Sequence, residues 1–185
     1  DPLTGLPNRT TFLDRLGAAL GTPHAEVAVI YCDLDGFKSV NDRFGHEEGD
    51  RVLELAAARL AATVRGDDLV ARLGGDEFAL LVHGSDACSR AGAVATRIVE
   101  AMRPPLVSAS VAVTVSASVG VCCSAGGSAV PATLVRAADQ AMYQAKRAGG
   151  DRVVFWVDGP GAVSPEQAGV GSDRSQLQES VPRSA

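Results

Sequence analysis

Three acidic residues, Asp33, Asp76 and Glu77, stand at the ends of two short apolar segments of the sequence. If those segments pair in one sheet, the three carboxylates meet at its rim. Such a rim could hold Mg²⁺, which prefers carboxylate, carbonyl and phosphate oxygens, and two such ions can activate an attacking oxygen while neutralising the leaving one. On spacing alone a plainer interpretation is favoured, in which Asp35 caps the following helix and the Gly-Asp step only makes a turn.

The apolar periodicity predicts the elements that would position these acids. Residues 27–34 form a nearly continuous, β-branched apolar run, which is typical of a strand buried on both faces. Residues 69–73 and 78–82 are predicted to form a β-hairpin, with glycines in its turn. The order of elements favours an α+β fold with a ferredoxin-like sheet and helices packed on it. Further strands are predicted at 111–123 and 152–157, and helices at 8–20, 37–44, 47–64, 87–102 and 131–148.

The composition is that of a globular domain followed by a polar segment. With 46% hydrophobic residues among its 185, the chain can bury one core of ordinary size. From residue 158 onward Gly, Pro, Ser, Gln and charged residues dominate, and such a segment cannot bury enough surface to order itself. We therefore expect a domain at 1–157 and a disordered tail or linker at 158–185.

Net charge, the length of the apolar runs and the spacing of the cysteines exclude several classes of protein. The formal net charge of -5 lacks the general basic field of a nucleic-acid binder, so we expect no nucleic acid as partner. No uncharged apolar run approaches the roughly 20 residues that span a bilayer, so we expect no membrane contact from this segment. The four cysteines lack CxxC spacing, which favours buried thiols in a reducing compartment and a cytoplasmic location.

Four motifs occur in order along the chain. They are DPLTGLPNR at 1–9, DLDGFK at 33–38 followed by ND at 41–42, GHEEGD at 45–50, and GGDEF at 74–78. Together these motifs resemble the GGDEF family of diguanylate cyclases, whose pattern is DxLTGLxNR, DxDxFKxxND, GHxxGD and GGDEF. The resemblance runs from Asp1 to about Val157. Because the order and spacing agree at separated places, the resemblance is far more specific than GGDEF alone.

The resemblance implies a five-stranded, mostly antiparallel sheet flanked by helices, of the nucleotidyl-cyclase palm type. It also implies condensation of two GTP molecules into cyclic di-GMP and two pyrophosphates, with Mg²⁺ or Mn²⁺ as cofactor and two ions at each active site. Asp33, Asp76 and the Leu34 carbonyl match metal ligands, and Asp76 also matches the proton acceptor for the attacking 3′-hydroxyl. Glu77 matches a second essential acid. Gly74 and Gly75 lack side chains, which lets the backbone approach a triphosphate closely.

The same resemblance assigns residues to the substrate. Asn41 and Asp50 match the pair that reads guanine, and an amide with a carboxylate can accept from and donate to that base edge. Lys38 and Lys146 match cations that face the phosphates. Read from the residues alone, each of these four is also an ordinary polar residue of a helix surface. Because each domain holds one GTP and the product is symmetric, the resemblance further implies a homodimer of half-sites.

One motif departs from the family pattern. The usual closing sequence resembles YxAKxxGRN, but this chain has Gly150 and Asp151 where arginine and asparagine are usual. A guanidinium that would bind phosphate is therefore missing from its expected place. Arg147 and Arg152 are the candidates to replace it, and GTP affinity is expected to be weaker than is typical.

A further short motif, Arg65-Gly66-Asp67-Asp68, resembles the RxxD site through which the family's product inhibits the enzyme. Arg65 would meet phosphate or guanine acceptors, and Asp68 would accept from a guanine edge. Taken alone, the turn could equally be a helix end with solvated charges. A second arginine of such a site would be Arg90 or Arg97, and the sequence does not distinguish them.

Two other functions compete with an active cyclase. One is a catalytically weak or silent GGDEF module that binds GTP or cyclic di-GMP for signalling, and the altered Gly150 is the main argument for it. The other is a generic nucleotide-binding domain, which leaves the match of Asn41 and Asp50 unexplained. Because the chain starts at the family's first motif, we expect it to be a piece of a longer protein, whose input signal and other domains the sequence does not name.

Overall fold

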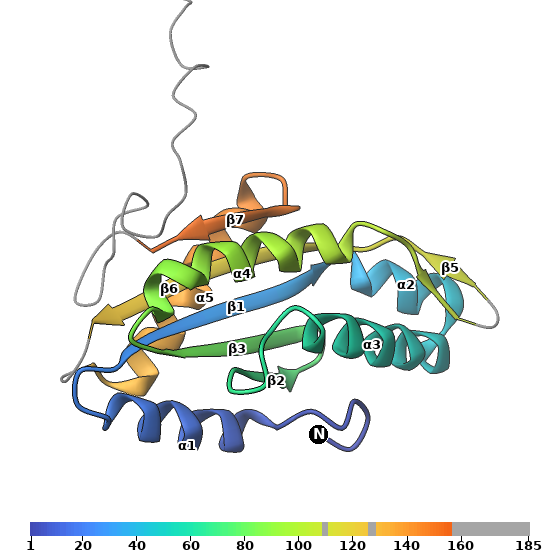
Figure 1. Cartoon of the computed structure of the whole chain (residues 1–185). Coiled ribbons are helices and arrows are strands. Elements are labelled where there is room, and N and C mark those ends of the chain that lie inside the picture. The colour runs from blue at the N-terminus through green and yellow to red at the C-terminus, as the bar shows by residue number, and fades with distance from the viewer. Residues whose placement is uncertain (109–110, 126–128, 157–185) are drawn as a thin grey trace, which may run out of the picture.

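The computed structural model describes residues 1–108, 111–125 and 129–156. Its centre is a five-stranded sheet in the order β2-β3-β1-β6-β7, whose strands lie one above another in Figure 1, from β2 at the bottom to β7 at the top. The middle strand β1 (Glu26–Asp35) pairs antiparallel with both β3 (Glu77–Gly84) and β6 (Ser116–Ala125). At the edges, β2 (Leu69–Gly74) is antiparallel to β3, and β7 (Arg152–Phe155) is parallel to β6. The expected α+β fold with a mostly antiparallel five-stranded sheet is confirmed.

Helices cover both faces of this sheet. The α1 helix (Arg9–Leu20) and α5 (Pro131–Arg147) pack on one face, and α3 (His46–Ala61) and α4 (Ala87–Met102) pack on the other. The short α2 (Phe37–Phe44) follows β1 directly and contacts α3. Successive residues of a strand point to opposite faces, so Ile30 joins the core under α3 and α4 while Val29 joins the core under α1 and α5. The prediction of a central strand buried on both faces is therefore confirmed.

The connection between α4 and the sheet differs from the sequence-based expectation. The single strand predicted at 111–123 is divided into β5 (Ala112–Val113) and β6, and β5 pairs with β4 (Leu106–Val107) as a separate small hairpin. Arg59 of α3 holds the start of this hairpin, with Nη2 donating to the Pro105 carbonyl at 2.9 Å. Two-residue strands carry no readable alternation, which is why the sequence pattern merged β5 with β6 and missed β4.

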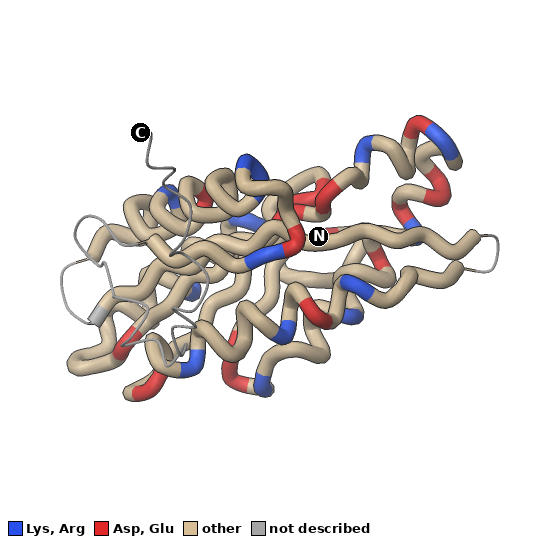
Figure 2. Tube along the Cα trace, turned by 90° about the horizontal axis from the view of Figure 1, so that it is seen from above, with Lys and Arg blue, Asp and Glu red and all other residues tan. Residues whose placement is uncertain are grey.

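Other boundaries agree closely with the prediction. The helix expected at 47–64 ends earlier, at Ala61, and Thr63 closes it by bonding its hydroxyl to the Leu60 carbonyl at 2.7 Å. Residue 157, and the tail or linker expected at 158–185, lie outside the described residues. Figure 2 shows that the charged residues lie along the helices and at the ends of strands, whereas the interior of the sheet is largely free of them. None of the described helices combines the length and apolar character needed to cross a membrane.

Candidate active site at one end of the sheet

The three acids predicted from the sequence meet at one end of the sheet. Asp33, near the end of β1, is the register partner of Glu77, the first residue of β3. The Leu34 amide donates to the Asp76 carbonyl at 3.3 Å, which ties the hairpin turn to β1. Two segments more than 40 residues apart in the sequence thus place their carboxylates side by side, as the pairing hypothesis required.

Asp33 is the most buried of these acids. Its side chain is 7% exposed, and its Oδ1 lies 2.5 Å from Nζ of Lys146, in the last turn of α5. Burial raises the pKa of Asp33 to about 6; the contact with Lys146 opposes this rise, and the charges of Asp76 and Glu77 add to it. Burial also disfavours the charged form of Lys146, but the Asp33 carboxylate outweighs it and raises the pKa of Lys146. The site therefore holds more negative charge than its one contacting lysine balances.

This donor set suits a divalent cation. Asp33 and Asp76 offer hard carboxylate oxygens, the Leu34 carbonyl follows Asp33 directly in β1, and the surplus negative charge is what Mg²⁺ or Mn²⁺ would neutralise. Among the residues that the structure describes, no group of three His, Cys, Asp or Glu side chains is arranged so that it could hold a metal ion by itself. The residues thus fit a cation in charge and donor type, with positions left for oxygens from a substrate.

The pair Asn41 and Asp50 lies on two helices that meet beside this site. Gly45, with φ 82°, separates α2 from α3 and turns the second helix back along the first. Gly49 of α3 lies directly against the Asn41 side chain, because a Cβ at Gly49 would stand 1.8 Å from Asn41 Oδ1. The missing side chain therefore seats the Asn41 amide next to Asp50, which is exposed. Such an amide and carboxylate can together pair with a base edge.

Lys38 and the two glycines of the turn are all exposed at the same end. Lys38 stands in the first turn of α2, directly after β1, and Gly74 and Gly75 form the tip of the β2–β3 hairpin. The strand register shifts between Arg72 and Gly74, so the tip is a bulged turn. The structure thus leaves Lys38 and the tip backbone open to a ligand.

Arg72 is a residue of this site that the sequence did not indicate. Its Nε and Nη2 donate to the Gly75 carbonyl at 2.9 and 2.8 Å, and its Nη1 pairs with Asp1 Oδ1 at 3.1 Å. Asp1 in turn accepts from the Thr4 amide at 2.9 Å. The first motif therefore buttresses the hairpin turn from outside. The acid at the start of the DxLTGLxNR motif, Asp1, indicates that this position matters to the domain, but the sequence does not show that its partner is Arg72.

Asp35 does not cap a helix, which corrects the plainer interpretation of this acid. Gly36 is the N-cap residue of α2, and the Asp35 carboxylate instead accepts from the hydroxyls of Ser116 and Ser118 at 2.7 Å each. The Asp151 amide also donates to Asp35, at 3.1 Å. Asp35 therefore fastens β1 to β6 and to the loop after α5, the helix whose last turn carries Lys146.

The same contacts explain the position of Gly150. This residue has φ +71°, and a Cβ there would stand 2.7 Å from Asp35 Oδ2. A side chain at this position is therefore disfavoured both by the backbone conformation and by a clash with Asp35. Arg152 folds back on this loop, with Nε donating to the Gly150 carbonyl at 3.0 Å. Arg147 lies elsewhere, in a cavity it lines with Tyr143 and Trp156. Of the two candidate arginines, Arg152 is the one beside the loop that follows Lys146.

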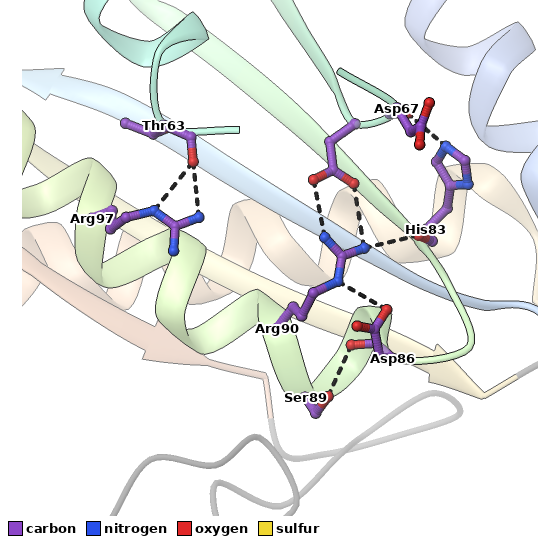
Figure 3. Close-up of polar contacts among 8 residues, drawn as sticks. Thr63, Asp67, His83, Asp86, Ser89, Arg90 and Arg97 are labelled. Carbon is purple, nitrogen blue, oxygen red and sulfur yellow. Dashed lines mark hydrogen bonds and ion pairs between the residues drawn. The ribbon is translucent and has the colours of Figure 1, made fainter. Parts of the chain in front are cut away.

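The Arg65–Asp68 turn lies at the opposite end of the hairpin from Glu77. The eight residues of β3 separate the two ends by about 20 Å. The turn borders a cavity of about 650 Å³ that Arg65, Asp68, Asp86 and Arg90 help to line. Arg90 lies against Asp68, at 3.1 Å from Nη1 to Oδ2, whereas Arg97 donates to the Thr63 carbonyl at 2.9 Å. Figure 3 shows Arg97 directed to Thr63, and Arg90 directed to Asp86 and His83. The structure thus places Arg90, and not Arg97, with the RxxD turn.

A comparison with known families decides the identity of this fold and site. The family model described as "Diguanylate cyclase, GGDEF domain" matches residues 1–152. The chain belongs to the GGDEF domain family. It is 41% identical over 172 residues to the diguanylate cyclase TpbB of Pseudomonas aeruginosa. The aligned region covers 90% of this chain and 40% of that protein. The chain thus spans less than half the length of this curated relative.

Solved GGDEF structures share the fold. The crystal structure of the GGDEF domain of PA1120 (YfiN or TpbB) from P. aeruginosa has a TM-score of 0.79 and 38% identity, covering 84% of this chain and 99% of that one. The GGDEF domain of DgcB from Caulobacter crescentus, solved in complex with c-di-GMP, has a TM-score of 0.78 and 28% identity, covering 85% of this chain and 95% of that one. The predicted family and fold are both confirmed.

Proposed function

We propose that this GGDEF domain is a diguanylate cyclase that condenses two GTP molecules into cyclic di-GMP and two pyrophosphates. The observation that carries the proposal is the meeting of Asp33, Asp76 and Glu77 at one sheet end, with Lys146 in contact with Asp33. Asn41 and Asp50, seated together by Gly49, supply a base-reading pair beside these acids. The family membership and the named relatives support the same reaction class.

Each residue of the site has a task in this reaction. Asn41 and Asp50 bind guanine, and Lys38 with Lys146 attracts the phosphates. Asp33, Asp76 and the Leu34 carbonyl would hold Mg²⁺ or Mn²⁺, with two ions in each site, and such ions would supply polarisation of the α-phosphate and a lower pKa of the 3′-hydroxyl. An Asp76 carboxylate oxygen accepts the proton of that hydroxyl, and Glu77 holds negative charge beside it. Gly74 and Gly75 let the turn backbone approach the triphosphate.

Catalysis requires two copies of the domain in this proposal. One site holds one GTP, and the symmetric product needs two opposed attacks of a 3′-hydroxyl on an α-phosphate. Two half-sites must therefore face each other, and the working enzyme is a homodimer. We place the domain in the cytoplasm, in keeping with cysteines that are all buried and free among the described residues.

The Arg65–Asp68 cavity is proposed to bind cyclic di-GMP and slow turnover. It presents several guanidinium groups and carboxylates on a concave surface, as a ligand with two phosphates and two guanines requires. The neighbouring structure of DgcB in complex with c-di-GMP supports product binding by domains of this fold. Asp33, Asp76 and Glu77 are all present, and a catalytically silent module would not need these three acids. We therefore favour an active enzyme.

The deciding experiment is incubation of the domain with GTP and Mg²⁺ or Mn²⁺ over a series of protein concentrations, with products separated by chromatography. We expect cyclic di-GMP and pyrophosphate, and a rate per mole of protein that rises with concentration because two half-sites must meet. A rate per mole that stays constant from nanomolar to high micromolar protein would refute the half-site arrangement. Absence of any cyclic di-GMP, with GTP still bound, would favour the silent module.

A further inference from the structure

Glu77 has no cation beside it. Lys146 pairs with Asp33, and within the described part of the chain no lysine or arginine forms an ion pair with Glu77. The Glu77 side chain is half-buried at the start of β3. Another neighbour must therefore hold its carboxylate in one orientation beside Asp33.

Tyr31 is the polar neighbour that can do this. In β1 it is the register partner of Ala79, and Glu77 lies two residues before Ala79 in β3. Tyr31 and Glu77 are thus diagonal neighbours on one face of the sheet, a separation that a long aromatic side chain can span. The Tyr31 side chain is buried, and its hydroxyl forms a side-chain hydrogen bond with Glu77.

The phenol of Tyr31 is enclosed from the other side by two helices. It lines a cavity of about 200 Å³ together with Arg9 of α1 and Asp139 of α5. Burial, followed by the charges of Glu77 and Asp139, raises the pKa of Tyr31 well above its ordinary value, and Arg9 opposes this rise. The hydroxyl consequently keeps its proton and stays a neutral donor.

A neutral donor suits this place better than a cation would. A lysine or arginine beside Glu77 would fix the carboxylate but would also cancel its charge. A phenol fixes the carboxylate and leaves its negative charge in place. The site needs that charge, because it is what attracts a divalent cation to the end of the sheet.

We propose that Tyr31 is a positioning residue for the reaction: its hydroxyl donates to the Glu77 carboxylate and holds this acid beside Asp33 without neutralising it. The role of Tyr31 rests on the cyclase function proposed above. The contact between Tyr31 and Glu77 does not, so the two can be tested separately.

The contact is tested by nuclear magnetic resonance on the 185-residue chain with ¹³C at the ζ carbon of tyrosine. The sequence contains two tyrosines, Tyr31 and Tyr143, so two signals are expected and each is assigned by its Tyr→Phe variant. We expect Glu77→Ala to move the Tyr31 signal upfield, because the phenol loses a charged acceptor. The signal of Tyr143, which is 59% exposed on α5, should stay in place.

The positioning role is tested by steady-state kinetics of Tyr31→Phe. This variant keeps the ring in the core, so its melting temperature should stay within a few degrees of wild type. We expect kcat to fall about tenfold, the worth of one hydrogen bond to a charged group, with the KM for GTP changed by less than about twofold. In a Glu77→Gln background the same change should alter the residual kcat by less than about twofold. Tyr143→Phe is the matched control and should change neither constant.

Four results would overturn the proposal. An unmoved Tyr31 signal in Glu77→Ala would remove the hydrogen bond. An unchanged kcat in Tyr31→Phe would show that the ring alone matters, and a raised KM at constant kcat would assign the hydroxyl to the substrate instead of the acid. If the wild-type chain formed no cyclic di-GMP, the cyclase function would fail and the positioning role with it, although a moved Tyr31 signal would still establish the contact.

Discussion

Replacing Gly49 by alanine should weaken substrate recognition while leaving the fold intact. A Cβ at this position would stand 1.8 Å from Asn41 Oδ1, so the Asn41 side chain must leave its place. An amide that pairs with a base contributes up to two hydrogen bonds, each worth about 1 kcal/mol net. We therefore expect the KM for GTP to rise about 10- to 30-fold, with a smaller change in kcat.

The fold should tolerate this change. Alanine is favoured over glycine inside a helix by about 1 kcal/mol, which offsets the cost of moving one half-buried amide. The melting temperature of Gly49→Ala should consequently lie within a few degrees of wild type. Gly17→Ala is the matched control, because Gly17 is also inside a helix and a Cβ there would meet only Pro131 Cγ, at 4.0 Å. It should leave the KM for GTP unchanged.

A double variant tests whether the effect passes through Asn41. In an Asn41→Ala background, Gly49→Ala should add almost nothing to the KM, because the amide it displaces is already gone. A wild-type KM in Gly49→Ala, or an additive effect in the double variant, would show that Asn41 does not bind the substrate from the position seen here. The assay is steady-state cyclic di-GMP formation over a range of GTP concentrations, with melting curves in parallel.

Four other substitutions have clear expected outcomes. Asp33→Ala and Asp76→Ala should abolish turnover while circular dichroism stays native, and substantial product at saturating Mg²⁺ would mean that the metal site has been misplaced. Arg72→Met should lower kcat severalfold with a native spectrum, since it frees the hairpin turn from its contact with the Gly75 carbonyl; unchanged kcat would make Arg72 a purely structural residue. Asp50→Ala should reduce GTP use more than residual ATP use, and a wild-type domain that used both nucleotides equally would contradict the guanine assignment.

Local sequence patterns were enough to predict the helices, the strands of the main sheet, and where three acids would meet if two of those strands paired, but not the small β4–β5 hairpin. The apolar run before Asp33 identified the central strand, and the glycines before Asp76 identified the hairpin that brings the acids together. Patterns of this kind report which residues are buried and where the chain turns. They do not report which distant partner a polar side chain finds, which is why the sequence favours a helix cap at Asp35 whereas its carboxylate accepts from serines of β6.

The same limit applies to charged clusters. The sequence offered Arg90 and Arg97 as equal candidates, because both lie on one helix and either could reach the RxxD turn. Their difference depends on how α4 rotates against β3, which is set by packing. The role of Arg72 is hidden in the sequence for the same reason. Its guanidinium bonds Gly75 nearby and Asp1 far away along the chain, and only the folded structure brings these two partners together.

The five residues of the GGDEF signature serve two different purposes, one for the reaction and one for folding. Phe78 is fully buried and belongs to the core under α3 and α4, whereas Gly74 and Gly75 are exposed at a tip where a Cβ would meet no other atom within 4 Å. If a lineage ceased to need the reaction, the tip could change at the cost of local backbone strain, since Gly74 and Gly75 have positive φ, while Phe78 would still be required for the core. We expect degenerate copies of this domain to diverge at the first four letters and to keep the fifth, so the letter that best survives carries the least information about activity.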